Sequence, residues 1–486
     1  MIEITVGDPD VDALLDQWAS RSLVERLAAG DSELWGPQAQ AEASERLGWL
    51  DLPTDSLQRL PEWEALAADR ADIRRVALAG MGGSSLGAEV VARATGVDLV
   101  TVDTTDAVAV QRRLLDAVTE TLLVVASKSG STVETNAHRQ AFEQALADAG
   151  LDEKARARHL VVVTDPGSPL EALAERSGWA VVHGRPDVGG RFSVLSAFGL
   201  LAPLLAGADV APMLEDASRL RPSLADPNGP AARLGAVLAL AARRTGQMTP
   251  RGAHGFADWA EQLIAESSGK SGAGLLPVVG DSTLAPTVGD DPGAAIQVSG
   301  PVGAQFLAWE FATSLLCAEL GIDAFNQPDV QRAKSATSEL LAEGSSWEAP
   351  ERSQAEIYAD IEDLVEAVPS GGYLAVLAFL DPDADSEVRQ LQHRIQRRRS
   401  DISVTFGWGP RYLHSTGQYH KGGPAVGAYL FITGSPGQEQ AGGYAFADLQ
   451  RAQALGDLQV LRDLGRPTVH VHLNDRSAGI SGLLQL

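Results

Sequence analysis

A stretch of nine residues, Ser127-Lys-Ser-Gly-Ser-Thr-Val-Glu-Thr, carries hydroxyl groups at a density that suggests phosphate binding. The hydroxyls belong to Ser127, Ser129, Ser131, Thr132 and Thr135. A phosphate group is bound by several short donors, especially where a helix N-terminus adds unpaired backbone amides. We therefore predict a phosphate site in this stretch, with Lys128 included in it. The alternative is a capping box formed by Ser131 and Glu134, which accounts for only two of these residues.

A glycine-rich stretch, Gly80-Met-Gly-Gly-Ser-Ser-Leu-Gly, follows an earlier apolar run. Glycine lets a backbone approach a ligand closely, and the helix expected after this stretch offers further amides. We assign Gly83 and Ser84 to ligand contact, with an ordinary tight turn as the alternative. Neither stretch has the glycine pattern that ends in Gly-Lys-Ser/Thr, so a nucleoside triphosphate is not indicated.

Apolar runs that could form strands alternate with helical patterns along the whole chain. The runs span 76–79, 98–102, 122–126, 159–164, 179–183, 275–279, 373–379, 403–406, 428–432 and 468–473. Continuous apolar strands between helices predict an α/β fold with two doubly wound, mainly parallel sheets and helices on both faces. We place the domain boundary at residue 206, which gives domains 1–206, with its N-terminal helices, and 207–486. Both polar stretches then lie at the carboxyl ends of strands, where such sheets bind ligands.

The composition excludes several classes of function. The 486 residues carry a formal net charge of −25, which argues against nucleic acid as a partner and requires local donors for an anionic substrate. A run of eighteen apolar residues and a signal peptide are both absent from the sequence, and Cys317 is its one cysteine, so we expect a cytoplasmic protein without a membrane span. His470 and His472 alternate in an expected strand without a carboxylate or cysteine partner, so we expect no metal.

The two polar stretches together resemble the sugar-isomerase (SIS) domain, which binds phosphosugars on a doubly wound sheet. Three further stretches make the resemblance specific to the phosphoglucose isomerase family. They are Val188-Gly-Gly-Arg-Phe-Ser-Val-Leu-Ser, Gln262-Leu-Ile-Ala-Glu-Ser-Ser-Gly-Lys and Phe325-Asn-Gln-Pro-Asp-Val-Gln-Arg-Ala-Lys. The C-terminal part of the chain is similar to the isomerase half of transaldolase–isomerase fusion proteins.

This resemblance implies reversible isomerisation of glucose 6-phosphate and fructose 6-phosphate through an enediol, in glycolysis and gluconeogenesis, by a homodimer without a cofactor. It makes Glu266 the base, Arg191 the cation that stabilises the enediolate, and Lys334 a contributor to ring opening. It also assigns Gln262 and Gln327 to phosphate binding. The chemistry needs such a set, because moving a proton between C2 and C1 requires a carboxylate beside the carbon and a cation near the developing oxyanion.

The sequence departs from the family pattern at the ring-opening histidine. The family carries this histidine between the catalytic glutamate and the Phe-Asp-Gln segment, but no histidine occurs here between residues 267 and 392. The stretch from Trp408 to Gly423 resembles the histidine-containing segment moved toward the C-terminus. It makes His414 the best counterpart and His420 the second.

Substitutions at other motif positions leave the substrate open. Asn326, Asp329 and Gln331 stand where the family has Asp, Gly and Glu, and Ser129-Gly130 replaces Thr-Phe. Two alternatives to a glucose 6-phosphate isomerase therefore remain. One is a non-catalytic phosphosugar-binding SIS protein, which would need the phosphate loop but no base. The other is a dual phosphoglucose/phosphomannose isomerase.

Overall fold

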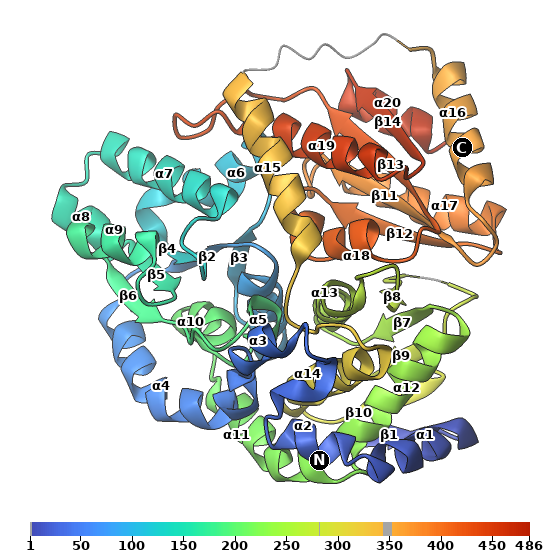
Figure 1. Ribbon diagram of the computed structural model, residues 1–486. Helices are drawn as coiled ribbons and strands as arrows, with labels where there is room; N and C mark the ends of the chain where they lie inside the picture. Colours follow the sequence, from blue (N-terminus) through green and yellow to red (C-terminus); the bar gives the residue numbers. More distant parts are fainter. Residues whose placement is uncertain (1, 281, 344–351) are drawn as a thin grey trace.

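The computed structural model describes residues 2–280, 282–343 and 352–486, and they form three sheets surrounded by helices (Figure 1). The first sheet is parallel, with the order β3-β2-β4-β5-β6. Its strands are β2 (Arg75–Gly80), β3 (Leu99–Val102), β4 (Thr121–Ala126), β5 (Leu160–Thr164) and β6 (Ala180–His183). Alternate residues of β4 pack into different clusters, Leu122 with α5 and α10 and Leu123 with α7 and α9, because successive side chains leave opposite faces of a strand.

The helices of this first region cover both faces of its sheet. They are α4 (Leu52–Asp69), α5 (Leu86–Thr95), α6 (Ala107–Val110), α7 (Val133–Asp148), α8 (Glu153–Arg158), α9 (Pro169–Ser177) and α10 (Ala197–Leu205). Strand β4 is buried along its whole length, as expected where helices cover a parallel sheet on both sides.

The second parallel sheet has the order β12-β11-β13-β14. Its strands are β11 (Tyr373–Phe379), β12 (Ser403–Trp408), β13 (Gly427–Gly434) and β14 (Thr468–Leu473), and its helices are α16 (Gln354–Ala367), α17 (Gln390–Arg398), α18 (Gly417–Gly422), α19 (Phe446–Asp463) and α20 (Arg476–Leu483). In both parallel sheets the first strand lies inside, the next strand pairs on one side of it, and the rest follow on the other side. The expected α/β fold with doubly wound, mainly parallel sheets is thus confirmed.

A third, mixed sheet was not expected. Its order is β1-β10-β9-β7-β8, with β1 antiparallel to β10. The strands are β1 (Glu3–Thr5), β7 (Gln247–Arg251), β8 (Leu276–Pro277), β9 (Thr287–Gly289) and β10 (Ile296–Ser299). They are short and mix apolar with polar residues, so only β8 coincides with an apolar run of the kind that predicts a buried strand.

The remaining α-helices come either before the first parallel sheet or between the two parallel sheets in sequence. They are α1 (Pro9–Ser20), α2 (Leu23–Ala28), α3 (Gln40–Ser44), α11 (Ala211–Leu220), α12 (Pro230–Arg244), α13 (Phe256–Ser268), α14 (Val302–Leu320) and α15 (Pro328–Glu343). Helix α15 packs along α19 and lies between the two parallel sheets in Figure 1. A boundary at residue 206 would fall between α10 and α11, and this division stays a prediction. None of the helices in the described ranges combines the length and apolar character needed to cross a bilayer.

Candidate active site

Three segments far apart in sequence meet at the carboxyl end of β2. A methyl group on Gly82, which has a φ of +55°, would lie 2.4 Å from the carbonyl oxygen of His414. One on Gly83 would lie 2.1 Å from the carbonyl oxygen of Gly190. The glycines therefore let the turn after β2 pack directly against the segments that carry Arg191 and His414. Ser84 is buried in the same turn.

The hydroxyl-rich loop follows β4, the neighbour of β2. Ser127 Oγ lies 2.9 Å from Thr132 Oγ1, and Ser129 Oγ lies 2.9 Å from Ser131 Oγ. Thr132 precedes the first turn of α7 without a side-chain capping bond, so the capping box of the alternative interpretation is not formed. The loop thus places two pairs of hydroxyls before the N-terminus of α7.

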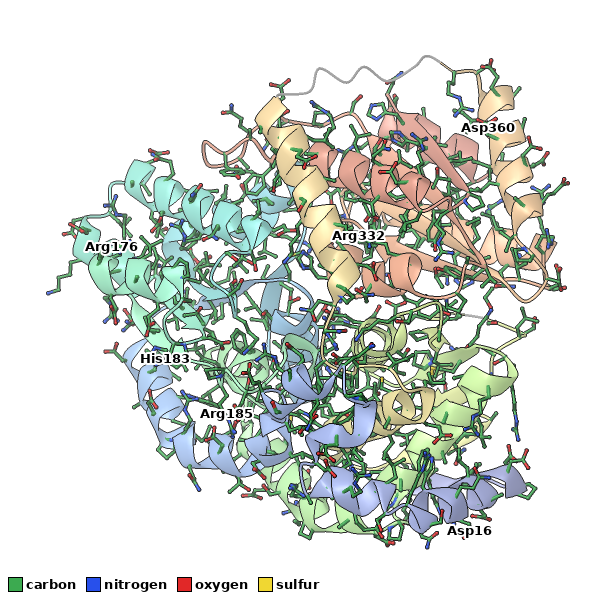
Figure 2. The ribbon with its side chains drawn as sticks, in the orientation of Figure 1. Asp16, Arg176, His183, Arg185, Arg332 and Asp360 are labelled. Carbon is green, nitrogen blue, oxygen red and sulfur yellow. The ribbon has the colours of Figure 1, made fainter. Side chains whose placement is uncertain are left out.

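Two other residues assigned to this loop are placed differently. Lys128 Nζ donates to Asp165 Oδ1 at 2.8 Å and to the carbonyl oxygen of Arg185 at 3.0 Å, so it extends toward the loops after β5 and β6. Arg185 is labelled in Figure 2. Thr135 is buried in α7, and its Oγ1 has no hydrogen-bond partner within the described part of the chain.

A glutamate, an arginine and a glutamine form the centre of the candidate site. Gln262 and Glu266 lie one turn apart on α13, and Gln262 Nε2 donates to Glu266 Oε2 at 3.1 Å. Arg191 Nη1 lies 3.3 Å from Glu266 Oε1. The Glu266 side chain keeps 12% of its surface exposed, while that of Arg191 keeps 3%. The carboxylate is therefore held by a cation yet open to a ligand.

Four acceptors fix the Arg191 guanidinium beside that carboxylate. Its Nε donates to Ser267 Oγ at 2.9 Å, and its Nη1 donates to Gln327 Oε1 at 3.0 Å. Its Nη2 donates to the carbonyl oxygens of Ala324 at 2.5 Å and Asn326 at 3.0 Å. The planar fork of arginine suits such a set of acceptors, so the motif that begins at Phe325 is joined to the Gly-Gly-Arg motif through this side chain.

The backbone of His414 lies next to this centre. Its carbonyl oxygen accepts a bond of 2.8 Å from Gln262 Nε2. Its ring Nε2 lies 2.9 Å from Glu134 Oε1, which also accepts a bond of 2.6 Å from Gln453 Nε2. Burial alone would raise the pKa of Glu134, but the facing His414 lowers that pKa to about 2. The carboxylate is thus ionised at neutral pH and orients the imidazole.

His420, the second candidate, lies in a different environment. It is buried, and its Nδ1 is 3.1 Å from the hydroxyl of Tyr373. Burial, with Lys421 as the next cause, places the pKa of His420 well below the ordinary value. This imidazole therefore packs in an aromatic cluster, with rings such as Tyr373 and Tyr429 against it.

Two lysines are placed in opposite ways. Lys334 is exposed on α15, the helix on which Figure 2 labels Arg332. Its part in ring opening stays a prediction. Lys270 is 3% exposed, and its Nζ donates to the carbonyl oxygen of Asp323. Burial, followed by repulsion from Arg191, lowers the pKa of Lys270 to about 7.

We missed Glu134 and Lys270 as functional candidates at the sequence level. Glu134 lies near the start of a helix, where a glutamate is usually a capping residue. Lys270 ends the Glu-Ser-Ser-Gly-Lys stretch, and its place in that motif is the signal that could have identified it. Its burial could not be read from the stretch itself.

The depressed pKa of Lys270 predicts a measurable dependence of stability on pH. A lysine with a pKa of about 7 in the folded chain and about 10.4 unfolded costs stability at neutral pH. This cost shrinks as pH rises from about 7 toward 10, because the unfolded chain then binds the extra proton. The free energy of unfolding of the wild type, relative to Lys270→Met, should therefore rise by about 2–3 kcal/mol between pH 7 and pH 9. Urea unfolding at both values checks this, and equal differences at the two would contradict it.

A cavity of about 530 Å³ opens beside this site but does not include it. Asp258, Glu261 and Arg411 are among the residues that line it, and none of the residues assigned from the sequence does. Its position shows that α13 has a second polar face, separate from that of Glu266. Within the described ranges, no group of three or more His, Cys, Asp and Glu side chains is placed to bind a metal ion.

Known proteins match the N-terminal part of the chain, which carries the first motifs of the site. The family model described as phosphoglucose isomerase matches residues 57–225. A probable glucose-6-phosphate isomerase from Natronomonas pharaonis is 38% identical over 252 residues, which cover 49% of this chain and 57% of the relative. The matched part of this chain is thus similar to phosphoglucose isomerases. The segment matched by the phosphoglucose isomerase family model includes the glycine-rich turn, the hydroxyl-rich loop and Arg191, whereas Glu266 and His414 lie beyond it.

A further curated relative and one solved structure also match this chain. A glucose-6-phosphate isomerase of Thermus thermophilus is 40% identical over 186 residues, 37% of this chain and 44% of that protein. The chain therefore matches about half the length of the curated phosphoglucose isomerases that it resembles. A solved structure of a hypothetical protein, also from Thermus thermophilus, aligns with a TM-score of 0.49 and 22% identity, covering 100% of this chain and 91% of that one.

Proposed function

We propose that this protein is a glucose-6-phosphate isomerase, which interconverts glucose 6-phosphate and fructose 6-phosphate in the cytoplasm for glycolysis and gluconeogenesis. The observation that carries the proposal is the Glu266 carboxylate, bonded to Gln262 and placed 3.3 Å from Arg191. This centre lies against the segment of His414. The names of the relatives support the same activity. A homodimer belongs to the proposal and is tested by light scattering.

The hydroxyl-rich loop would hold the phosphate of the sugar. Its serine and threonine hydroxyls pair with one another and can turn toward an incoming anion. The first amides of α7, next to Thr132, add donors and a favourable dipole. This local arrangement offsets the repulsion expected from the chain's net charge of −25.

Glu266 would carry the proton between C2 and C1. A carboxylate that is partly exposed can reach the substrate, take the C2 proton and return it at C1. The negative charge that develops on the substrate oxygen is stabilised by Arg191, whose orientation is already fixed by its acceptors. A fixed donor needs no rearrangement at the moment of reaction.

His414 would open the sugar ring before that transfer. An imidazole can relay a proton between the ring oxygen and the C1 hydroxyl, because its charge changes easily near neutral pH. Glu134 holds the ring through Nε2. The isomerase thus divides its work between two carboxylates, one that reacts and one that orients.

The direct test is to offer fructose 6-phosphate to the purified chain and detect glucose 6-phosphate with a coupled dehydrogenase. We expect turnover, whereas binding without turnover would favour the phosphosugar-binding alternative. A parallel assay with mannose 6-phosphate decides whether the C2 specificity is relaxed. Absence of both binding and turnover would contradict the proposal.

Removing hydroxyls from the loop tests the phosphate site. In the double variant Ser127→Ala/Thr132→Ala, the KM for fructose 6-phosphate should rise at least tenfold, because hydrogen bonds to a charged group are worth about 1.5–3 kcal/mol each. Ser44→Ala is a matched control, since that exposed hydroxyl bonds only to a carbonyl of its own helix, Ala41. An unchanged KM in the double variant would remove the loop from the site.

A further inference from the structure

A second cavity, of about 430 Å³, lies at the carboxyl end of the second parallel sheet. It is enclosed by the ends of β11, β13 and β14 and by one side of α19, which lie together in Figure 1. The polar residues of its lining are Thr433, Ser435, Gln450, Arg451, His470, His472 and Asn474. None of them belongs to the candidate active site.

The cavity occupies the place where a doubly wound sheet binds ligands. The chain reverses its direction across the sheet between β11 and β13, and residues at the ends of both strands line the cavity. In the first sheet the corresponding reversal lies between β2 and β4, whose loops form the predicted phosphate site. The short polar segment Thr433-Gly-Ser-Pro, which begins in the last two residues of β13, corresponds in position to the hydroxyl-rich loop after β4.

Hydrogen bonds organise the floor of this cavity. Thr433 Oγ1 lies 2.8 Å from His470 Nε2 and 2.8 Å from His472 Nδ1. Ser435 Oγ lies 3.2 Å from His472 Nε2. The imidazoles are therefore held at defined angles, so the polar lining is preorganised.

One buried polar group in the lining is left without a partner. Gln450 is 6% exposed, and its Nε2 has no hydrogen-bond partner in the described ranges. An unpaired buried amide costs about 1–3 kcal/mol, and such groups are rare in folded proteins. A ligand with an acceptor oxygen in the cavity would satisfy it.

The charge of the lining selects for an anion. Arg451 contributes a guanidinium from α19, and the described lining contains no carboxylate, although the chain has 64 acidic residues. The Arg451 Nη1 bond to Asp448 Oδ1, at 3.2 Å, joins two partly exposed side chains. Such an exposed pair contributes little, so an anion can compete for the guanidinium.

We propose that this cavity is a second binding site, for a small phosphorylated polyol, distinct from the isomerase centre. Arg451 and His472 bind the phosphate, and the amides of Gln450 and Asn474, together with Ser435, bind the hydroxyls. The site does not depend on the proposed isomerase function, because the two sets of residues do not overlap.

Calorimetric titration with glucitol 6-phosphate, which has no carbonyl group and cannot be isomerised, tests the proposal. The wild type should bind two molecules per chain. Arg451→Gln should weaken one of these sites by about tenfold or more and leave the other unchanged. Gln450→Leu, which removes the unpaired amide without removing a charge, should weaken the same site. Arg462→Gln, an exposed residue of the same helix, is the matched control and should keep both sites.

The phosphate-loop variant separates the two proposals. Ser127→Ala/Thr132→Ala should lose the isomerase site but keep the site at Arg451. A single site in the wild type that survives Arg451→Gln would overturn the second site. A single site that is lost in Arg451→Gln and kept in the loop variant would support it and contradict the phosphate loop instead. Two sites of unchanged affinity in both cavity variants would overturn it as well.

Discussion

Glu266→Gln should lower kcat for fructose 6-phosphate by about 10²–10⁴-fold and change the dissociation constant for a sugar phosphate little. The amide keeps the size of the side chain and an oxygen that can accept from Arg191 Nη1, now 3.3 Å away. It cannot accept the C2 proton. An interaction that is used only in the transition state lowers kcat without a matching change in binding, and this is the pattern we expect.

The neighbouring Glu261 supplies a matched control. It lies on the same helix, α13, but lines the 530 Å³ cavity instead of the face of Gln262 and Glu266. Burial, with Asp258 as the next cause, raises the pKa of Glu261 well above its usual value, so an amide is a mild change there. Glu261→Gln should retain most activity. If Glu266→Gln is equally active, Glu266 is not the base.

The thermal stability of Glu266→Gln should be measured together with its kcat. Gln262 Nε2 donates to both Glu266 Oε2 and the carbonyl oxygen of His414. An amide nitrogen in place of the Oε2 acceptor would face another donor, which can cost about 1–3 kcal/mol. Binding measured on the folded variant separates this local cost from the loss of the base.

The parts of the fold that sequence could predict are those whose strands are buried on both faces. Runs such as 122–126 are continuous because helices cover both sides, and the strand β4 spans 121–126. The sequence did not predict the mixed sheet, because β7 contains Gln247 and Pro250 and β9 is three residues long. Short strands of this kind owe their form to packing against helices such as α12 more than to their own pattern.

The N-terminal region shows the same limit on a smaller scale. Apolar spacing predicts one helix over 11–30, and the structure instead has α1 and α2 separated near Ser22. Ser22 adopts a φ of +50°, which ends the regular helical hydrogen bonding. Periodicity alone does not contain that information, because both short helices keep their apolar residues on a buried side.

Motifs could predict which residues gather in the site but not every orientation within it. Arg191 and Glu266 are close, and the backbone of His414 reaches Gln262, across 152 residues of sequence. Glu134 was interpreted as part of a possible capping box. Its actual partner, His414, lies 280 positions away in sequence, and the local pattern does not indicate it. Tertiary packing, which local patterns do not encode, decides between these roles.

Replacing His414 should slow cyclic substrates more than open-chain ones. In His414→Gln, the side-chain amide can still donate to Glu134, so the buried carboxylate keeps a partner in addition to Gln453. The amide cannot relay a proton between the ring oxygen and the C1 hydroxyl near pH 7. We expect kcat/KM for fructose 6-phosphate to fall by about 10²-fold or more, in the range of one acid–base step.

A tetrose 4-phosphate serves as the open-chain substrate, because its phosphate occupies the oxygen that would close a furanose ring. Glu266 can isomerise such a substrate without ring opening, so its kcat/KM should fall much less in His414→Gln. His183→Gln is the matched control, since this imidazole, labelled in Figure 2, also faces a glutamate, Glu171, but belongs to β6, the edge strand of the first sheet. An equal loss with both substrates would mean that His414 supports the site through its contact with Glu134 and does not open the ring.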